Sequence, residues 1–516
     1  MANAGYTTDL SVVASAEAAE TWVELVGAAA GGNPDETETE NYVHGSGSVS
    51  QTMGTATGWK SLAFDLGSPR TIAAGDASFH WLYFGAPLAL GTLANSGMGI
   101  AIGNSTANWK FWKVRGKDTY AYGGWINVAV DPTCAADGQQ GSPTGATQVF
   151  GSAINLCAAV SKGNPHAADV IRTGRSIVVT GGGGSLYGTF SGAASANDAS
   201  GSRWGLCQAI DGGYLVKGRF QIGTATLSAD FRNSNTSVLI QDLPRVSPSF
   251  TVFDIRNADS RVDWTNISFS SLGTNTRGIL SAYNNADINI ESCSFTDMDS
   301  AWFAPNSTIN NSTFRRTDTI VQSGSTIDGC IFDSCRGSMT ISSDNPALIS
   351  NSSFTSDGSN NAIEIKTLGA SAAYTLTGLT YSNYAAAGSA ASNVGIYNNS
   401  GQYLELTING GDEPSYTDGP GASTLIITGQ RILTLTGLVA GSEVRIYSAG
   451  TTTELAGIET CDTSFDYPYT FASDTYVDIV VHNVDYLYYR LEDYELLDGN
   501  SSLPIQQQTD RQYNNP

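Results

Sequence analysis

The sequence has few charged residues, little basic charge and no long apolar run. Asp, Glu, Lys and Arg make up 14% of the 516 residues, against about 25% in an ordinary globular protein. Only 25 Lys and Arg stand against 48 Asp and Glu, which gives a net charge of −23. A phosphate backbone would meet net repulsion, so nucleic acid is not expected as a partner.

The sequence also lacks the usual signals for membranes, export and metals. No apolar segment reaches the roughly 18 residues of a membrane helix, so membrane insertion is not expected. The opening MANAGYTTDL has neither the basic nor the hydrophobic region of a secretory signal peptide. The seven cysteines form no CxxC pair and have no neighbouring histidine, so neither zinc nor a disulfide framework is indicated and no cofactor is predicted.

A repeat between about Val262 and Tyr381 is the clearest feature that is present. An aliphatic residue or tryptophan is followed five positions later by an aromatic ring. The pairs are Trp264/Phe269, Ile290/Phe295, Ile309/Phe314, Ile327/Phe332, Ile349/Phe354 and Leu376/Tyr381. The irregular spacing of these rings, roughly 20 residues, is typical of one coil of a parallel β-helix with loops of varying length.

Two further positions of the repeat carry a pattern. The third is small or turn-forming, which predicts a sharp bend between two strands: Asn266, Ser292, Asn311, Gly329, Asn351 and Gly378. The fourth lies two residues before the aromatic, on the same strand face, and should point into the core. The predicted core stack is Ile267, Cys293, Ser312, Cys330, Ser352 and Leu379, with Phe269, Phe295, Phe314, Phe332 and Phe354.

The flanking segments also favour β-structure, since 57 glycines and many turn residues separate strand-like runs. Residues 1–170 hold six of the nine tryptophans and predict an aromatic-rich β-sandwich or jelly-roll. Their rings either pack in the core or stack on sugars. A helix is predicted at Ala14 to Ala30. Residues 421–502 alternate in polarity and predict a small acidic, Ig-like β-sandwich.

The predicted fold is therefore all-β. A right-handed parallel β-helix over residues 171–420 is flanked by the two β-sandwiches, and residues 503–516 form a polar C-terminal arm. That arm has no hydrophobic pattern, so alone it should be disordered, unless it becomes ordered along a neighbouring subunit.

Acidic residues on the repeat are the candidates for catalysis, because glycoside hydrolysis needs two carboxyl groups at a defined separation. The candidates are Glu291, Asp297, Asp299 and Asp333, and a pair such as Asp297 and Asp333 could lie on adjacent coils. The alternative, which we favour, is that they are solvated turn residues. The repeat holds no histidine and lacks the Asp-Asp, Gly-His-Gly and Arg-x-Lys motifs of pectin-cleaving β-helix enzymes. We therefore expect no enzyme.

Parts of the sequence resemble proteins of tailed bacteriophages. INIESCSF (Ile288 to Phe295) and TIDGCIF (Thr326 to Phe332) are similar to coils of phage tailspikes and fibres, and also to other β-helix proteins. The C-terminal stretches Thr434 to Gly457 and His482 to Leu496, with the closing IQQQTDRQYNNP, resemble the ends of uncharacterised phage structural proteins. The chain thus resembles a virion structural protein.

The resemblance implies a tail fibre, a spike or a head-surface decoration protein, assembled in the cytoplasm of the bacterial host and located in the virion. The β-helix would be a rigid spacer, and the end domains would dock on other virion proteins and attach to the host surface or to a cell-surface glycan. A homo-oligomer is implied, with a trimer favoured. One alternative is a polysaccharide-degrading tailspike, a glycoside hydrolase or lyase. Another is a secreted bacterial adhesin, which would need an export signal.

Overall fold

A computed structural model shows a chain that is nearly all β-structure, as the sequence predicts. It describes residues 4–17, 20–25, 35–38, 42–52, 58–73, 76–84, 98–113, 125–133, 135–145, 147–156, 165–197, 204–240, 251–271, 278–281, 286–298, 300–342, 345–385, 393–428, 430–470, 475–497 and 499–510. The chain divides into two compact units, Met1–Thr308 with Ser312–Ile320, and Ile309–Asn311 with Val321–Pro516.

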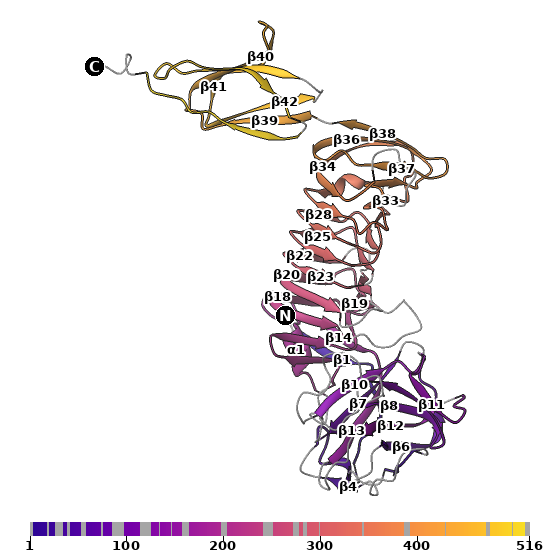
Figure 1. Ribbon diagram of the computed structural model, residues 1–516. Coiled ribbons are helices and arrows are strands. Elements are labelled where there is room, and N and C mark those ends of the chain that lie inside the picture. The colour runs from indigo at the N-terminus through magenta and orange to yellow at the C-terminus, as the bar shows by residue number, and fades with distance from the viewer. Residues whose placement is uncertain are drawn as a thin grey trace. The chain divides into compact units, whose positions relative to one another are not determined.

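The first unit begins with two antiparallel sheets (Figure 1). One has the order β10-β7-β13-β5-β4, with β2 also on β13, and the other has the order β11-β9-β8-β12-β6-β3. Their strands are β2 (Ser11–Ala14), β3 (Trp22–Val23), β4 (Asp35–Glu38), β5 (Ser48–Thr52), β6 (Gly58–Arg70), β7 (Ala77–Phe84), β8 (Met98–Ser105), β9 (Asn108–Lys113), β10 (Trp125–Val130), β11 (Gly138–Gln140), β12 (Thr147–Leu156) and β13 (Pro165–Gly174).

Both sheets contribute to one apolar core, which joins Val49, Leu82 and Val128 of the first sheet to Leu62, Ile100 and Phe150 of the second. Four tryptophans of this region are also buried: Trp22, Trp81, Trp109 and Trp112. Core packing therefore accounts for these four rings, which are not available to stack on a sugar. The predicted helix at Ala14 to Ala30 is wrong for the residues described there, because β3 lies within it and pairs with β6.

The rest of the first unit is built of stacked parallel strands (Figure 1). They are β14 (Ser176–Thr180), β16 (Gly213–Val216), β17 (Arg219–Ile222), β18 (Asp230–Ile240), β19 (Thr251–Ile255), β20 (Arg261–Ser271), β21 (Gly278–Ser281), β22 (Asp287–Glu291), β23 (Ser294–Thr296), β24 (Ala301–Phe303), β25 (Ser307–Asn310), β26 (Thr313–Arg315) and β27 (Ile320–Gln322). One series runs β14-β17-β19-β21-β24, and another runs β16-β18-β20 and continues into β22 and β23.

The aromatic anchors stack on one another because these strands pair in register. Phe269 of β20 lies beside Phe295 of β23, which lies beside Phe314 of β26. The ring centroids of each neighbouring pair are 4.9 Å apart, with interplanar angles of 1° and 10°. Of the predicted core stack, the six residues of this unit are buried: Ile267, Cys293, Ser312, Phe269, Phe295 and Phe314.

The bend before each aromatic is left-handed. Asn266, Ser292 and Asn311 have φ of 53°, 54° and 49°, a region that Asn and Gly adopt with the least strain. The next positions of the series, Gly329, Asn351 and Gly378, share it, with φ of 62°, 47° and 65°. The structure thus confirms a left-handed bend at all six positions. It separates two strands in four repeats and lies within the long strands β20 and β34 in the other two.

The first repeats are closed by a short helix, α1 (Phe190–Ser195). Its Phe190 is fully buried and contacts the rings of Phe220, Phe231, Phe253 and Phe269, with the centroid of Phe231 at 5.2 Å. Two antiparallel pairings lie nearby, β1 (Gly5–Thr8) on β14 and β15 (Cys207–Ile210) on β16. An aromatic plug therefore covers the apolar interior where the stack begins.

The second unit contains further stacked parallel strands. They are β28 (Thr326–Asp328), β29 (Ile331–Asp333), β30 (Met339–Ile341), β31 (Ile349–Ser350), β32 (Ser353–Thr355), β33 (Ile363–Ile365), β34 (Ala372–Ser382), β35 (Ile396–Asn398), β36 (Tyr403–Gly411), β37 (Tyr416–Asp418) and β38 (Ser423–Thr428), with a 3-10 turn, η3 (Pro346–Leu348), before β31. Phe332, Phe354 and Tyr381 are stacked in the same way. The other predicted core residues, Cys330, Ser352 and Leu379, are buried beside them.

Two small sheets follow in the second unit, with the orders β42-β39-β45 and β41-β40-β43-β44. Their strands are β39 (Gln430–Thr436), β40 (Ser442–Ser448), β41 (Glu454–Cys461), β42 (Ser464–Thr470), β43 (Tyr476–His482), β44 (Tyr489–Glu495) and β45 (Ser501–Pro504). Leu433 and Leu435 of one sheet share a core with Val444, Ile446 and Ile479 of the other.

The C-terminal arm is ordered over residues 503–510, contrary to the expectation of a disordered segment. β45 pairs in parallel with β39, and Ile505 is buried in the core of the two small sheets. The side-chain oxygen of Gln507 accepts a hydrogen bond from the Val439 N–H at 2.7 Å. The sequence did not reveal this order because one buried isoleucine among polar residues forms no pattern. Residues 511–516 lie outside the described part of the chain.

Candidate functional site

Three of the predicted carboxylates, Glu291, Asp297 and Asp333, lie in the part of the chain that the structure describes. Arg316 donates to both carboxylate oxygens of Asp297, at 2.7 Å each. Asp333 accepts a hydrogen bond from the Ser334 hydroxyl at 2.8 Å, and Glu291 accepts one from the Ser292 hydroxyl at 3.0 Å. Each of these acids therefore bonds to a side chain in its own or the next repeat. Asp299 lies outside the described residues.

The expectation that Asp297 and Asp333 lie on adjacent coils is wrong. Asp297 directly follows β23, whose parallel neighbours are β20 on one side and β26 on the other. Asp333 belongs to β29, which is neither of these strands. The aromatic spacing in the sequence already placed the repeat of Phe314 between them.

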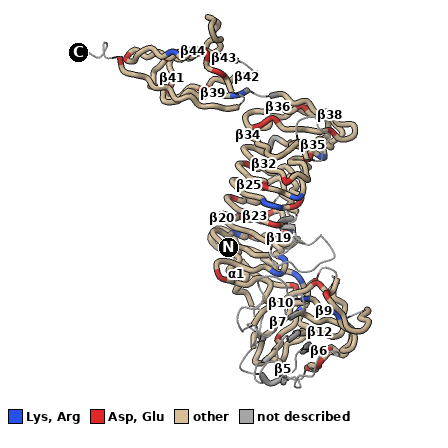
Figure 2. Tube along the Cα trace, in the orientation of Figure 1, with Lys and Arg blue, Asp and Glu red and all other residues tan. Residues whose placement is uncertain are grey.

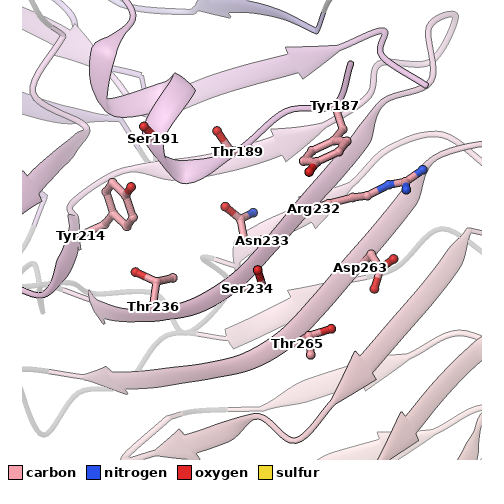
Figure 3. Close-up of a pocket in the computed structure, with 10 residues that line it drawn as sticks. All are labelled: Tyr187, Thr189, Ser191, Tyr214, Arg232, Asn233, Ser234, Thr236, Asp263 and Thr265. Atoms are coloured by element: carbon pink, nitrogen blue, oxygen red, sulfur yellow. The ribbon is translucent and has the colours of Figure 1, made fainter. Parts of the chain in front are cut away.

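A groove of about 390 Å³ near the first repeats is the candidate site (Figure 3). The residues that line it come from the segment around the start of α1 and from β16, β18 and β20. They are Tyr187, Thr189, Ser191, Tyr214, Arg232, Asn233, Ser234, Thr236, Asp263 and Thr265. Figure 3 shows Tyr187 and Tyr214 on opposite sides of the groove, with Asn233 and Ser234 between them.

Tyr187 and Arg232 form one side of this groove. The Arg232 guanidinium carbon lies 5.2 Å from the centre of the Tyr187 ring, a cation–π contact. Two nitrogens of Arg232 donate to the two carboxylate oxygens of Asp230, at 2.6 Å each. The hydrogen bonds to Asp230 raise the pKa of Arg232 above its usual value. They outweigh the loss of hydration of the guanidinium, which acts in the opposite direction. Arg232 is thus fixed as a cation beneath an exposed ring.

The opposite side of the groove is fixed by contacts to Phe190 of α1 and to Tyr6 of β1. The Tyr214 ring packs against Phe190, with centroids 5.8 Å apart. The Tyr6 hydroxyl accepts a hydrogen bond from the Thr189 N–H at 2.8 Å and donates to the Thr189 carbonyl. The Asn233 side-chain oxygen accepts from the Phe190 N–H at 2.8 Å, while its amide nitrogen has no partner among the described residues.

The β-strand register sets the floor of the groove. β18 and β20 are parallel, with Arg232 beside Asp263 and Ser234 beside Thr265. Asp263 in turn accepts from Arg261, at 3.2 Å, and from the Asn289 amide. Both carboxylates close to the groove, Asp230 and Asp263, are therefore ion-paired with arginine.

Two histidines of the first unit are buried far from solvent in the N-terminal sheets. The Nε2 atom of His80 lies 2.7 Å from the Ser78 hydroxyl, and that of His166 lies 2.8 Å from the Ser152 hydroxyl. Burial lowers the pKa of each imidazole to about 3. With all four side chains fully buried, these Ser–His contacts are structural and cannot meet a substrate.

Within the described ranges, no group of three or more His, Cys, Asp or Glu side chains is placed to hold a metal ion. None of the helices in these ranges combines the length and the apolar character needed to cross a membrane. Along the Cα trace, acidic and basic residues are scattered between long uncharged stretches (Figure 2).

Sequence reasoning missed every residue of the groove. The repeat motif begins near Val262, whereas most of the lining precedes it. β18 belongs to the predicted range of 171–420 and pairs in parallel with β16 and β20. Nothing in the sequence indicated that α1 would fold over that strand and leave a groove beside it.

Comparison with known proteins gives no family. No protein-family model and no curated protein matches the chain. Among solved structures, the chain is similar to one described as the crystal structure of the Agl-KA catalytic domain, with 12% identity and a TM-score of 0.18. The match covers 79% of this chain and 97% of that one. A likeness at this TM-score supports no conclusion about fold or activity.

Proposed function

We propose that the chain is a non-enzymatic structural component of a bacteriophage virion, a tail fibre, spike or head-surface protein. Its stacked repeats are a right-handed parallel β-helix that serves as a rigid spacer. The N-terminal sheets form a jelly-roll-like sandwich and the C-terminal sheets an Ig-like sandwich, which dock on other virion proteins and attach to the host surface. The chain assembles as a homo-oligomer, with a trimer favoured.

The stacked aromatic interior is the observation that supports a spacer. In the first unit, Phe269, Phe295 and Phe314 lie within 4.9 Å of their neighbours and are buried. Each repeat hydrogen-bonds to the next and is packed solidly inside, so bending would break many small contacts at once. The phage assignment itself depends on the sequence resemblance.

Particle composition tests this role. Phage particles from the bacterium that carries the gene would be purified on a density gradient and analysed by mass spectrometry and immunogold labelling. We expect the chain to co-purify with the particles and to label a tail or the head surface. Recovery of the chain from the cell envelope or culture medium, and not from particles, would instead support the adhesin alternative. Sedimentation of the purified chain should give the mass of three copies.

Glycan cleavage tests the enzyme alternative. Purified chain would be incubated with capsule or lipopolysaccharide of the same bacterium, and the glycan length followed by gel filtration. We expect unchanged length, because Asp297 is held by Arg316 and Asp333 lies on a non-adjacent strand. Shortening that is abolished in Asp297→Asn would contradict the non-enzymatic role.

A further inference from the structure

The groove beside α1 is lined by side chains that carry hydrogen-bonding groups. Seven of its ten lining residues carry a hydroxyl: Tyr187, Thr189, Ser191, Tyr214, Ser234, Thr236 and Thr265. The other three supply an amide, a guanidinium and a carboxylate, so none of the ten described residues that line it is aliphatic. A ligand that matches such a surface must itself carry many hydroxyl or amide groups, and an apolar ligand would leave these groups unpaired.

Tyr187 gives the groove an apolar platform as well. Its side chain is 40% exposed, although Arg232 lies against the ring and is itself fixed by Asp230. A tyrosine presents an apolar face beside a polar edge, which suits a ligand that has both. Because the ring is already held, little conformational entropy is lost when a ligand packs against it.

Local charge is balanced around the groove. Arg232 is paired with Asp230, and Asp263 is paired with Arg261. Neither sign is in excess among these four groups, and the whole chain has a net charge of −23. A polyanion would therefore be repelled at long range and would find no unpaired arginine in the groove.

We propose that this groove binds a short neutral oligosaccharide. Sugar hydroxyl and acetamido groups match the Ser, Thr and Tyr hydroxyls, and the apolar face of a pyranose ring matches Tyr187. Ser234 and Thr265, side by side on β18 and β20, contact the sugar from the floor of the groove. This proposal rests on the proposed role in host attachment. It assigns the sugar-binding part of that role to the first repeats.

An oligosaccharide array tests the proposal with the full-length chain. The probes are neutral hexose and N-acetylhexosamine oligosaccharides, with sialylated and uronic-acid oligosaccharides for comparison. The groove variants are Tyr187→Ala, which removes the platform, and Ser234→Trp, which fills the groove from an exposed position. The matched controls are Tyr488→Ala and Thr226→Trp, at exposed sites elsewhere. Circular dichroism and the unfolding temperature establish that each variant is folded.

We expect at least one neutral oligosaccharide to bind. Each folded groove variant should bind it at least about tenfold more weakly, and both controls should bind it as the unchanged chain does. No binding to any neutral probe, binding to acidic probes alone, or binding that both groove variants retain would overturn the proposal. If the groove binds no sugar but the chain is found in phage particles, only the sugar-binding proposal fails. If the groove binds sugar but the chain is absent from particles, only the virion role fails.

Discussion

Arg316 holds Asp297 with two hydrogen bonds of 2.7 Å across neighbouring repeats, and both residues have a left-handed backbone, with φ of 49° and 57°. Each lies two positions after the aromatic of its repeat. Since Phe295 and Phe314 are in register, an acid in one repeat meets a base at the same position of the next. The ion pair between Asp297 and Arg316 therefore follows from the in-register stacking of the repeats.

Asp297→Asn should therefore reduce stability slightly and change nothing else. The substitution removes the charge but keeps a side chain that tolerates the left-handed bend. The pair is partly exposed, so we expect a loss of about 0.5–1 kcal/mol, measured by urea unfolding. The loss should shrink in high salt. A loss of several kcal/mol would mean that the pair is more than a surface contact.

Ser292→Gly should stabilise the repeats. Ser292 has φ of 54°, which strains a residue with a Cβ atom by about 1 kcal/mol or more relative to glycine. We expect the free energy of unfolding to rise by about 0.5–1 kcal/mol, net of the greater chain entropy of glycine. The control is Ser294→Gly in the extended strand β23, where glycine should instead lower stability. Equal effects at the two sites would contradict the bend.

Phe295→Ala should strongly lower the free energy of unfolding. Phe295 is buried between Phe269 and Phe314, so removing its ring loses the buried area and leaves a cavity. We expect a loss of about 3–5 kcal/mol. Phe295→Leu should lose less, since part of the volume remains. The control is Thr313→Ala, at a half-buried position on the neighbouring strand β26, where we expect a loss of no more than about 1 kcal/mol.

Acid should destabilise the N-terminal sheets through His80 and His166. Burial lowers both folded-state pKa values to about 3, while the unfolded value is about 6.5. The unfolded chain therefore binds more protons between these values. Stability is full above about pH 6.5 and falls by about 1.4 kcal/mol per pH unit for each histidine as the pH drops toward 3.

Tryptophan fluorescence during urea unfolding at pH 7.5 and 5.5 would measure this loss, since six of the nine tryptophans lie in residues 1–170. Asp169, whose pKa is raised by burial, acts in the opposite direction at lower pH. A variant with His80→Gln and His166→Gln should lose most of the pH dependence in this window. An unchanged slope in that variant would assign the effect to other groups.

Ile505→Ala should loosen the C-terminal sheets. Ile505 follows β45 and is buried in the core shared with Leu433 and Val444. We expect a loss of about 2–4 kcal/mol, seen as faster hydrogen exchange in peptides that cover β39. The control is Gln506→Ala, at the exposed neighbouring position. If Ile505→Ala exchanged no faster than the control, the arm would not be part of the folded sheets.

The repeat was predictable because one spacing recurs and each position has a single physical role. Asn266 marks the bend, Ile267 faces inward and Phe269 stacks, so the residues of one repeat describe the others. The groove was not predictable for the opposite reason. Tyr187, Tyr214 and Arg232 belong to no repeated pattern in the sequence. They line one groove only because α1 folds over β18. Ile505 was missed likewise, since a single apolar residue in a polar tail becomes meaningful only beside Leu433.

Phe190 covers the end at which the stack of repeats begins. Stacked parallel strands end in unpaired backbone groups and an open apolar interior, onto which the strands of another chain could add. A ring buried among Phe220, Phe231 and Phe253 occupies that interior, so further strands find neither an apolar floor nor room. Phe190 thus protects this end of the stack against pairing with the strands of another chain.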